Sequence, residues 1–340
     1  MRAIRIGCLL LMGALVSAAP AIGAELYEGK TVRIVVGFPA GGGFDIYART
    51  IARHLGRHLP GQPVVIVENM PGASSLLAAN HLYARSKPDG TTLGFFHGNL
   101  ITQHLLGGEG IAFDPLKFEW IGSPTVSTGV CVMRKATGIT SVEKWMASPE
   151  PVKLGAIAPG DTTYDIAKIL SAALSLPVRL VEGHKGVPDI RLAAERGDVA
   201  GFCVVWETVK VVWSKALESG EAVAVLQVAP KRHPDLPNVP LAMDLAKTTE
   251  ARDLIRVGIH NPATIIRLLA APPGTPSDRV QALRKAFVAT LRDAEFLAEA
   301  RRAKLEVDSL SGEDVQKIVM DYRDVSPATK KKLQEILLRK

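Results

Sequence analysis

The sequence predicts an α/β fold of two lobes, each built on a mixed, mainly parallel sheet flanked by helices. Short apolar runs of strand length alternate with segments whose apolar residues recur at helical spacing, a pattern typical of parallel strands joined by crossover helices. The length of 340 residues also exceeds what one hydrophobic core commonly holds. We expect residues 25–125 and 228–340 to form lobe 1 and residues 126–227 to form lobe 2.

The first 24 residues have the pattern of a cleaved signal peptide. Arg2 and Arg5 give a basic start, residues 6–16 are an apolar run, and small residues follow. The run is shorter than the roughly 20 residues of a membrane-spanning helix. A buried N-terminal helix is the alternative and fits these flanks less well. We expect a secreted mature chain that begins near Glu25.

The first part of the mature chain alternates three strands with two helices. We expect strands at 32–36, 64–67 and 92–96, and helices at 48–59 and 75–84. Turns rich in glycine and proline follow the first two strands, which is where a strand gives way to a helix.

The alternation continues through the rest of the chain. Expected strands are 153–157, 178–181 and 199–205, expected helices are 163–174 and 189–195, and 222–228 is predicted as a strand that returns to the first lobe. The C-terminal third is predicted to be helical. Ser277 precedes one amphipathic segment, and Ser311 with Asp314 forms a capping box before another.

The charge and the cysteines argue against nucleic-acid binding and against a cysteine-ligated metal site. Without Arg2 and Arg5 the formal net charge falls from +7 to +5, and the excess is scattered, so we expect no nucleic-acid partner. Cys131 and Cys203 have no neighbours at metal-ligand spacing. In an oxidising compartment they can pair, but two buried free thiols fit the sequence equally well.

The most informative segment is the glycine-rich turn at 36–45. Backbone amides at the start of a helix favour an anion, and glycine allows close approach because no Cβ intervenes. The turn lacks the ending of a phosphate loop and the G-x-G-x-x-G of a dinucleotide site. A tight turn without a ligand is the alternative. Asp45 is predicted to support the loop amides and the helix dipole rather than to act as a catalytic acid.

Three further loops have the same strand–loop–helix arrangement. They lie at 69–74, 160–163 and 184–187. In open α/β sheets such loops line up at the carboxyl ends of the strands, where ligands bind. Four amide-bearing loops on two facing lobes would therefore close around one cleft.

Several motifs occur in a characteristic order along the chain. They are GFPAGGGFD at 37–45, VENMPGA at 67–73, PDGTTL at 88–93, KG at 185–186, KRHPDLPNVP at 231–240 and APPGTP at 271–276. With these motifs the sequence resembles the tripartite tricarboxylate transporter receptors, also called Bug-type binding proteins, over essentially the whole mature chain. The resemblance implies a type II periplasmic-binding-protein-like fold and a periplasmic location.

The resemblance also implies a ligand site. Proteins of this family clamp carboxylates, dicarboxylates or carboxylated aromatic acids between the lobes with loop amides, hydroxyls and bridging waters. The candidate residues in the first lobe are Phe38, Ala40, Gly41, Gly42, Gly43, Asp45, Asn69, Gly72 and Ala73. Those in the second lobe are Gly160, Asp161, Thr162, Thr163, His184, Lys185, Gly186 and Trp206.

The chain departs from the family pattern at three places. His184 replaces the usual tyrosine, Asp161 lies in a commonly neutral loop, and Trp206 belongs to a bulkier segment than usual. Their structural explanations are a solvated turn, a helix cap and core packing, respectively. The alternative is a pocket reshaped for a larger or aromatic acid, or for one bearing an amine.

These observations predict a binding receptor and not an enzyme, because no nucleophile–base or paired-acid arrangement is visible. The expected partners are a small carboxylate and the membrane subunits of a tripartite tricarboxylate-type transporter. We expect a monomer with no cofactor and no metal. Two alternatives stay open, namely a binding protein that signals to a membrane sensor kinase and a periplasmic enzyme on the same fold.

Overall fold

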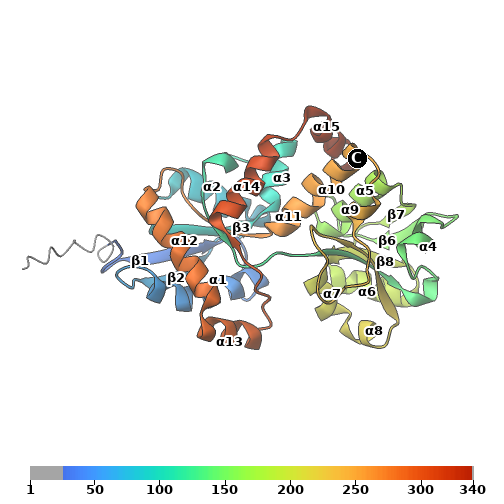
Figure 1. Cartoon of the computed structure of the whole chain (residues 1–340), viewed down its shortest axis with the longest axis horizontal. Helices are drawn as coiled ribbons and strands as arrows, with labels where there is room; N and C mark the ends of the chain where they lie inside the picture. The colour runs from blue at the N-terminus through green and yellow to red at the C-terminus, as the bar shows by residue number, and fades with distance from the viewer. Residues whose placement is uncertain (1–25, 339–340) are drawn as a thin grey trace, which may run out of the picture.

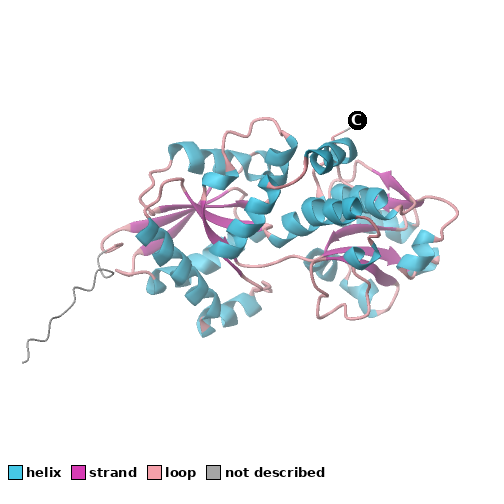
Figure 2. Ribbon diagram, turned by 45° about the horizontal axis from the view of Figure 1, so that its top comes forward, coloured by secondary structure: helices cyan, strands magenta, loops and turns pink. Residues whose placement is uncertain are grey.

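The computed structural model describes residues 26–338, which form two groups of strands side by side, each enclosed by helices (Figures 1 and 2). The predicted α/β architecture with two mixed sheets is confirmed. The sheets are not mainly parallel, because four of the strand pairings among the described residues are parallel and five are antiparallel. The signal-peptide prediction concerns residues 1–24 and lies outside the described residues. Within 26–338, no helix has both the length and the apolar character that crossing a membrane requires.

The first sheet has six strands in the order β11-β4-β10-β3-β1-β2. The strands β1, β2 and β3 run parallel, whereas β10 is antiparallel to β3 and β4, and β11 is antiparallel to β4. The strands span Thr31–Val36 (β1), Val64–Asn69 (β2), Thr92–His97 (β3), Glu119–Ser123 (β4), Arg267–Ala271 (β10) and Leu310–Ser311 (β11).

Side chains that alternate along these strands fill two hydrophobic layers. Phe95 packs in one layer with α1, α12 and α13, and its neighbour Phe96 packs in the other with α2, α3 and α14. Both rings are completely buried. The helices span Gly43–Leu55 (α1), Leu76–Arg85 (α2), Asn99–Leu106 (α3), Ser277–Arg292 (α12), Ala294–Arg302 (α13) and Gly312–Arg323 (α14).

The second sheet has five strands in the order β7-β6-β8-β5-β9. Its strands span Gly129–Arg134 (β5), Val152–Gly155 (β6), Val178–Val181 (β7), Gly201–Val205 (β8) and Ala222–Val228 (β9). Its helices span Val142–Met146 (α4), Thr162–Leu174 (α5), Val187–Arg196 (α6), Trp206–Val212 (α7) and Ser214–Glu218 (α8). The strand predicted at 222–228 forms β9. It pairs antiparallel with β5, which buries the apolar residues at its C-terminal end. The return of the chain to the first lobe after this strand remains a prediction.

The C-terminal segment crosses between the two groups. Three of the helices that follow β9, namely α9, α10 and α15, pack against α5. These later helices span Ala242–Leu245 (α9), Thr249–Ile255 (α10), Asn261–Thr264 (α11) and Pro327–Leu337 (α15). A π-helix, η5 (Arg256–His260), joins α10 to α11. One hydrophobic cluster therefore runs from Phe96 through Ile255 to Ile166. The proposed lobe boundaries remain a prediction, and the packing associates α9 and α10 with the second sheet.

The chain also contains short 3-10 helices at Gly56–His58 (η1), Ala73–Ser75 (η2), Pro115–Lys117 (η3) and Lys135–Thr137 (η4).

Cys131 and Cys203 form a disulfide, which decides between the two states that the sequence left open. They lie directly opposite each other on the antiparallel strands β5 and β8, with their Cα atoms 4.0 Å apart. Both are completely buried. The bridge ties together two central strands of the second sheet across 72 residues of chain.

Candidate functional site

The glycine-rich loop lies between β1 and α1, as the sequence predicts. Gly42 is the N-cap of α1 and Gly43 its first residue, so the amides that open the helix have no carbonyl ahead of them to accept a hydrogen bond. Gly41 has φ of +81°, a left-handed conformation that favours glycine. Gly41, Gly42 and Gly43 are exposed. The loop therefore presents backbone donors at the positive end of a 13-residue helix.

A polar network centred on the buried carboxylate of Asp45 holds this loop in place. Asp45, which is 3 % exposed, accepts a hydrogen bond from the Gly41 amide at 2.8 Å. Arg49 Nε donates to the same carboxylate at 2.9 Å and its Nη2 donates to Asn69 at 3.0 Å. Asn69 in turn donates to Asp45 and to the Phe38 carbonyl, both at 2.9 Å. Asp45 and Asn69 thus connect the first loop to the end of β2.

The network fixes the charge of Asp45. Burial on its own acts to raise the pKa of this carboxyl, but the hydrogen bonds from Arg49, Gly41 and Asn69, with the charge of Arg49, lower the pKa to about 2. Asp45 is therefore ionised under ordinary conditions and is held by donors on several sides. Support of the loop is the role that this geometry favours.

Asp45→Ala is expected to lower the free energy of unfolding by about 2 kcal/mol at pH 7. Because the folded-state pKa lies below the unfolded value of 3.8, the contribution is complete above about pH 4 and is lost as pH falls through about 2. Urea unfolding at pH 7 and pH 2.5 measures the difference. Asp278→Ala, an exposed first-turn aspartate of α12, is the control. Equal stability of the Asp45 variant and the wild type at pH 7 would contradict the structural role.

The second loop is strained. Ala73, Ser74 and Ser75 have φ of 44°, 50° and 75°, three consecutive non-glycine residues in the left-handed region. Such strain persists only where the surroundings enforce it, and it gathers at ligand sites. Here the Ser75 hydroxyl accepts a hydrogen bond from the His97 amide at 2.9 Å, and a Cβ on Gly37 would come within 2.2 Å of that of Ser75. The first two loops therefore converge beside the end of β3.

An aromatic group and an arginine lie at the same place. The rings of Phe38 and Phe44 stack 4.2 Å apart, and Phe44 also stacks on His97 at 5.9 Å. The Arg267 guanidinium lies 5.3 Å from the Phe44 ring and 4.7 Å from that of Tyr47, within the range of cation–π attraction. Burial, with the nearby charge of Arg267, lowers the pKa of His97 to about 4, so this imidazole is neutral.

The third loop lies at the start of α5. Asp161 is the N-cap and accepts a hydrogen bond from the Thr163 amide at 2.8 Å, which is the helix-cap explanation given above. Thr163 is completely buried, and its hydroxyl also bonds to Asp161 and to the Ile157 amide. Gly160 donates its amide to Asp165 at 3.0 Å.

The fourth loop is held in a similar way. The His184 ring and its backbone amide both contact the Ala156 carbonyl, and the ring nitrogen lies 3.1 Å away. The Lys185 amide donates to Asp189 in the first turn of α6 at 3.2 Å. Gly186 is the N-cap of that helix. The first, third and fourth loops are therefore each held by an aspartate in the helix that follows the loop. These are Asp45, Asp165 and Asp189, respectively.

A cavity of about 30 Å³ lies between the two groups of strands. His97 and Asn99 line it from the first, Thr162 and Asp165 from the second, and apolar residues of β8 and of the η5–α11 segment complete it. Asn99 Nδ2 donates across the gap to the Gly160 carbonyl at 3.3 Å. A larger hollow of about 560 Å³ is lined by residues from Arg134 to Glu221 alone, and none of the four loops contributes to it.

The predicted residues fall into four groups. Thr162 lines the cavity and Gly160 borders it through Asn99. The ring centroids of Phe38 and His97 lie 6.4 Å apart, and the other first-lobe residues belong to the two loops beside His97 without lining the cavity. The remaining loop residues of the second lobe lie at the starts of α5 and α6 and do not line the cavity either, namely Asp161, Thr163, His184, Lys185 and Gly186. Trp206 is buried, donates to Asp235 at 3.0 Å and packs in the core of the second sheet.

The sequence reasoning missed four residues at this place, namely His97, Asn99, Asp165 and Arg267. Asn99 and His97 follow the third strand of the first sheet, and the same rule about carboxyl ends of strands could have found them. Asp165 is inside a helix, and Arg267 starts an antiparallel strand from far along the chain, so no local signal indicated them.

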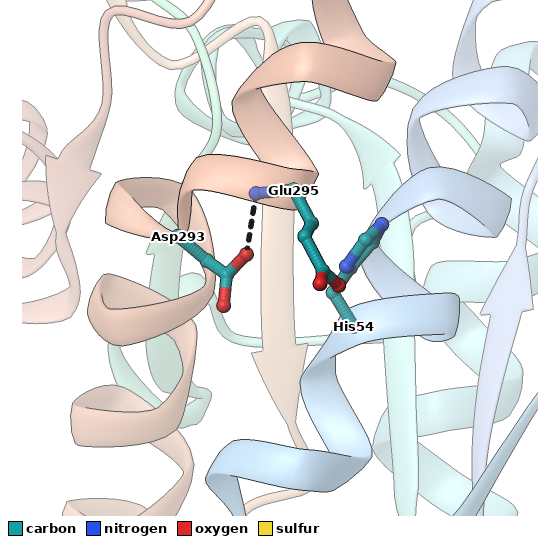
Figure 3. Close-up of side chains that lie close together, drawn as sticks. All are labelled: His54, Asp293 and Glu295. Carbon is teal, nitrogen blue, oxygen red and sulfur yellow. Dashed lines mark hydrogen bonds between the residues drawn. The ribbon is translucent and has the colours of Figure 1, made fainter.

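His54, Asp293 and Glu295 lie close together on α1 and at the start of α13, with their ligand atoms within 4.8 Å of one another (Figure 3). Arg57 donates to both carboxylates and to the His54 ring. Asp293 is also the N-cap of α13 and accepts from the Glu295 amide at 2.9 Å. The cluster is thus an ion-paired helix cap in which a guanidinium occupies the place that a cation would take.

This chain is similar to a known protein family and to several solved structures. Residues 47–334 match the family model described as tripartite tricarboxylate transporter family receptor. The UPF0065 protein in the gbd 5′ region of Cupriavidus necator is 29% identical over 78% of this chain and 75% of its own. A solved TctC solute-binding protein from Polaromonas, without ligand, has a TM-score of 0.72 at 20% identity, covering 91% of this chain and 99% of its own. The Rpa4515 protein of R. palustris, solved with adipate, has a TM-score of 0.62 at 22% identity, covering 90% and 97%.

Proposed function

This chain belongs to the tripartite tricarboxylate transporter receptor family, and from that premise we propose that it captures a small carboxylate between its two lobes and delivers it to a transporter of this type. The observation that carries the proposal is the exposed glycine loop, whose free amides face outward from the start of α1. The adipate bound to the R. palustris protein supports a carboxylate as the ligand class.

The capture would rest on backbone donors and not on a dedicated ion pair. An anion at the start of α1 meets free amides and the positive end of the helix dipole. Each hydrogen bond to a charged group contributes roughly 1.5–3 kcal/mol. Four or five of them exceed the ~8 kcal/mol of a micromolar complex, before the freedom lost on binding is subtracted. Micromolar affinity is therefore expected.

The Arg267 guanidinium adds a positive charge beside the loop. A Cβ on Gly43 would lie 3.7 Å from Arg267 Nη2, so the guanidinium is close to the opening amides of α1. Arg267 Nε is buried and has no hydrogen-bond partner among the described residues. Its charge attracts an anion to this end of the cleft, while its stacking on Phe44 and Tyr47 keeps it in place.

Closure of the lobes forms part of the proposal. A cavity of about 30 Å³ has room for no more than a few water molecules, so an acid of several heavy atoms can enter only when the lobes or loops separate. The strand connection at 124–128 and the segment that follows β9 are the places where the chain passes from one sheet to the other. We further propose that residues 1–24 direct the chain to the periplasm, where it acts as a monomer.

The test begins with mass spectrometry of small molecules released when the purified protein is unfolded. We expect an acid, and its amide analogue should bind at least about tenfold more weakly, because one charge-assisted hydrogen bond is worth roughly 1.5 kcal/mol. The affinity for the acid should be lost as pH falls toward about 4, where a carboxylic acid protonates. An amide analogue that binds as tightly as the acid in calorimetry would refute carboxylate capture.

A further inference from the structure

Asp165 is a carboxyl group in the interlobe cavity without a positive partner. It lies in the first turn of α5 and lines the cavity together with His97, Asn99 and Thr162. Its Oδ1 accepts the Gly160 amide at 3.0 Å. Among residues 26–338, no donor bonds to Oδ2 and no lysine, arginine or histidine forms an ion pair with Asp165. One oxygen thus supports the loop, and the other is available to a molecule in the cavity.

Asp165 differs from Asp45 in the partners of its carboxylate. Both residues hold the amide of a glycine in the preceding loop. Asp45 is also neutralised by Arg49 and bonded by Asn69, whereas Asp165 has neither kind of partner. An isolated carboxylate in an apolar setting is unfavourable unless it is paired or protonated. The loop-holding role accounts for the position of Asp165 but gives its carboxylate no cationic side-chain partner among residues 26–338.

The surrounding groups do not supply the missing charge. Asp161, at the N-cap of the same helix, is another acid and repels the charge of Asp165. Across the cavity His97 is neutral, because burial and then Arg267 lower its pKa. Burial, opposed by the Gly160 amide and reinforced by Asp161, raises the pKa of Asp165 to about 7. A cationic group placed beside Oδ2 would restore the ionised form.

We propose that the ligand carries a positively charged nitrogen as well as a carboxylate, and that the nitrogen pairs with Asp165 while the carboxylate lies at the glycine loop. This inference rests on the proposed function and narrows its ligand class to amino acids in the broad sense. The charges around the cavity agree with it. Arg267 lies beside the opening amides of α1. His97 stacks on Phe44 of that helix and lines the cavity together with Asp165, so a positive and a negative group lie on either side of His97.

A ligand with two carboxylates would show the opposite pH dependence of binding. A protonated Asp165 could donate a hydrogen bond to a second carboxylate of a diacid. Binding would then strengthen as pH falls through about 7. Pairing with an ammonium group requires the ionised carboxylate, so binding of an amino acid strengthens as pH rises through the same range. The sign of the pH dependence therefore separates the two.

The experiment compares matched probes by calorimetry on the mature protein. The pairs are succinate with 3-aminopropanoate, glutarate with 4-aminobutanoate and adipate with 5-aminopentanoate, together with aspartate and glutamate. In at least one set the ammonium-bearing acid should bind about tenfold or more tightly than the diacid, the effect of one charge-assisted contact. Its affinity should fall at least threefold between pH 8 and pH 5.5.

Asp165→Asn keeps an oxygen that can hold the Gly160 amide and removes the charge. It should abolish both the preference for the ammonium-bearing acid and the pH dependence above 5.5, with an unchanged melting temperature without ligand. Asp278→Asn makes the same change in an exposed first turn outside the cavity and should alter neither. The wild-type pH profile requires no variant, so the test survives if Asp165→Asn fails to fold.

Four outcomes would overturn the inference. Diacids that bind more tightly in every set would refute it while leaving carboxylate capture intact. An amino-acid affinity that rises as pH falls, or a preference that survives in Asp165→Asn, would refute it in the same way. If no probe and no co-purified molecule with a carboxylate binds, the proposed function itself fails and this inference with it.

Discussion

Gly42→Val is expected to weaken binding of the best-binding acid at least 100-fold, about 2.8 kcal/mol, and to leave the fold intact. Gly42 has φ of −81° and ψ of 169°, which valine adopts readily, and the nearest atom to an added Cβ is the Pro39 carbonyl oxygen at an ordinary 3.5 Å. The fold therefore tolerates the side chain. A ligand at the opening amides of α1 does not, because the branched group stands in front of them.

Calorimetry with the acid released from the wild-type protein measures this loss, and thermal unfolding without ligand checks the fold. Ala303→Val places the same branched side chain at an exposed C-cap of α13 and should change neither quantity. Gly42→Ala should give an intermediate loss, since its side chain is smaller. An unchanged affinity in the valine variant would remove this loop from the binding site.

Replacement of both cysteines by alanine is expected to lower the free energy of unfolding by about 2–4 kcal/mol. The disulfide closes a loop of 72 residues, so its loss returns considerable freedom to the unfolded chain. Both sulfur atoms also lie in the hydrophobic cluster that joins the two sheets, where alanine leaves a small void. Chemical denaturation of the Cys131→Ala/Cys203→Ala protein measures the change.

Reduction provides the matched control for this prediction. Dithiothreitol should destabilise the wild type by a similar amount and have no effect on the double variant. Titration of two free thiols in the unfolded, non-reduced wild type would show that the bridge does not form in the isolated protein, and the predicted loss would then be reduced to the cost of the voids alone.

The helices and strands were predictable where local chemistry is strong. The apolar run at 32–36 lies within β1, and the glycine-rich turn after it begins α1. The capping box was also predictable, because the Ser311 hydroxyl accepts the Asp314 amide over only three residues. The helix predicted at 48–59 begins at Gly43 instead, since Gly42 acts as the N-cap despite having no side chain.

The pairing of strands was harder to predict from the sequence than their positions. Residues 222–228 form a strand as predicted, but nothing in the sequence indicated that its partner is β5. An apolar run specifies that a strand is buried and does not specify its neighbour. That choice depends on contacts between residues far apart in the sequence, such as those between β9 and β5.

The sequence by itself determined the α/β class, the four loops at the carboxyl ends of strands and the family, because each depends on short stretches of chain with their own local preferences. Only the tertiary structure decided that Cys131 faces Cys203, that the Asp45 carboxylate accepts hydrogen bonds from Arg49 and Asn69, and that Asp165 and His97 line one cavity. These contacts join residues from separate elements. The net interaction of a charge depends on the distance to its neighbours and on the water excluded between them, and those quantities exist only in the folded chain.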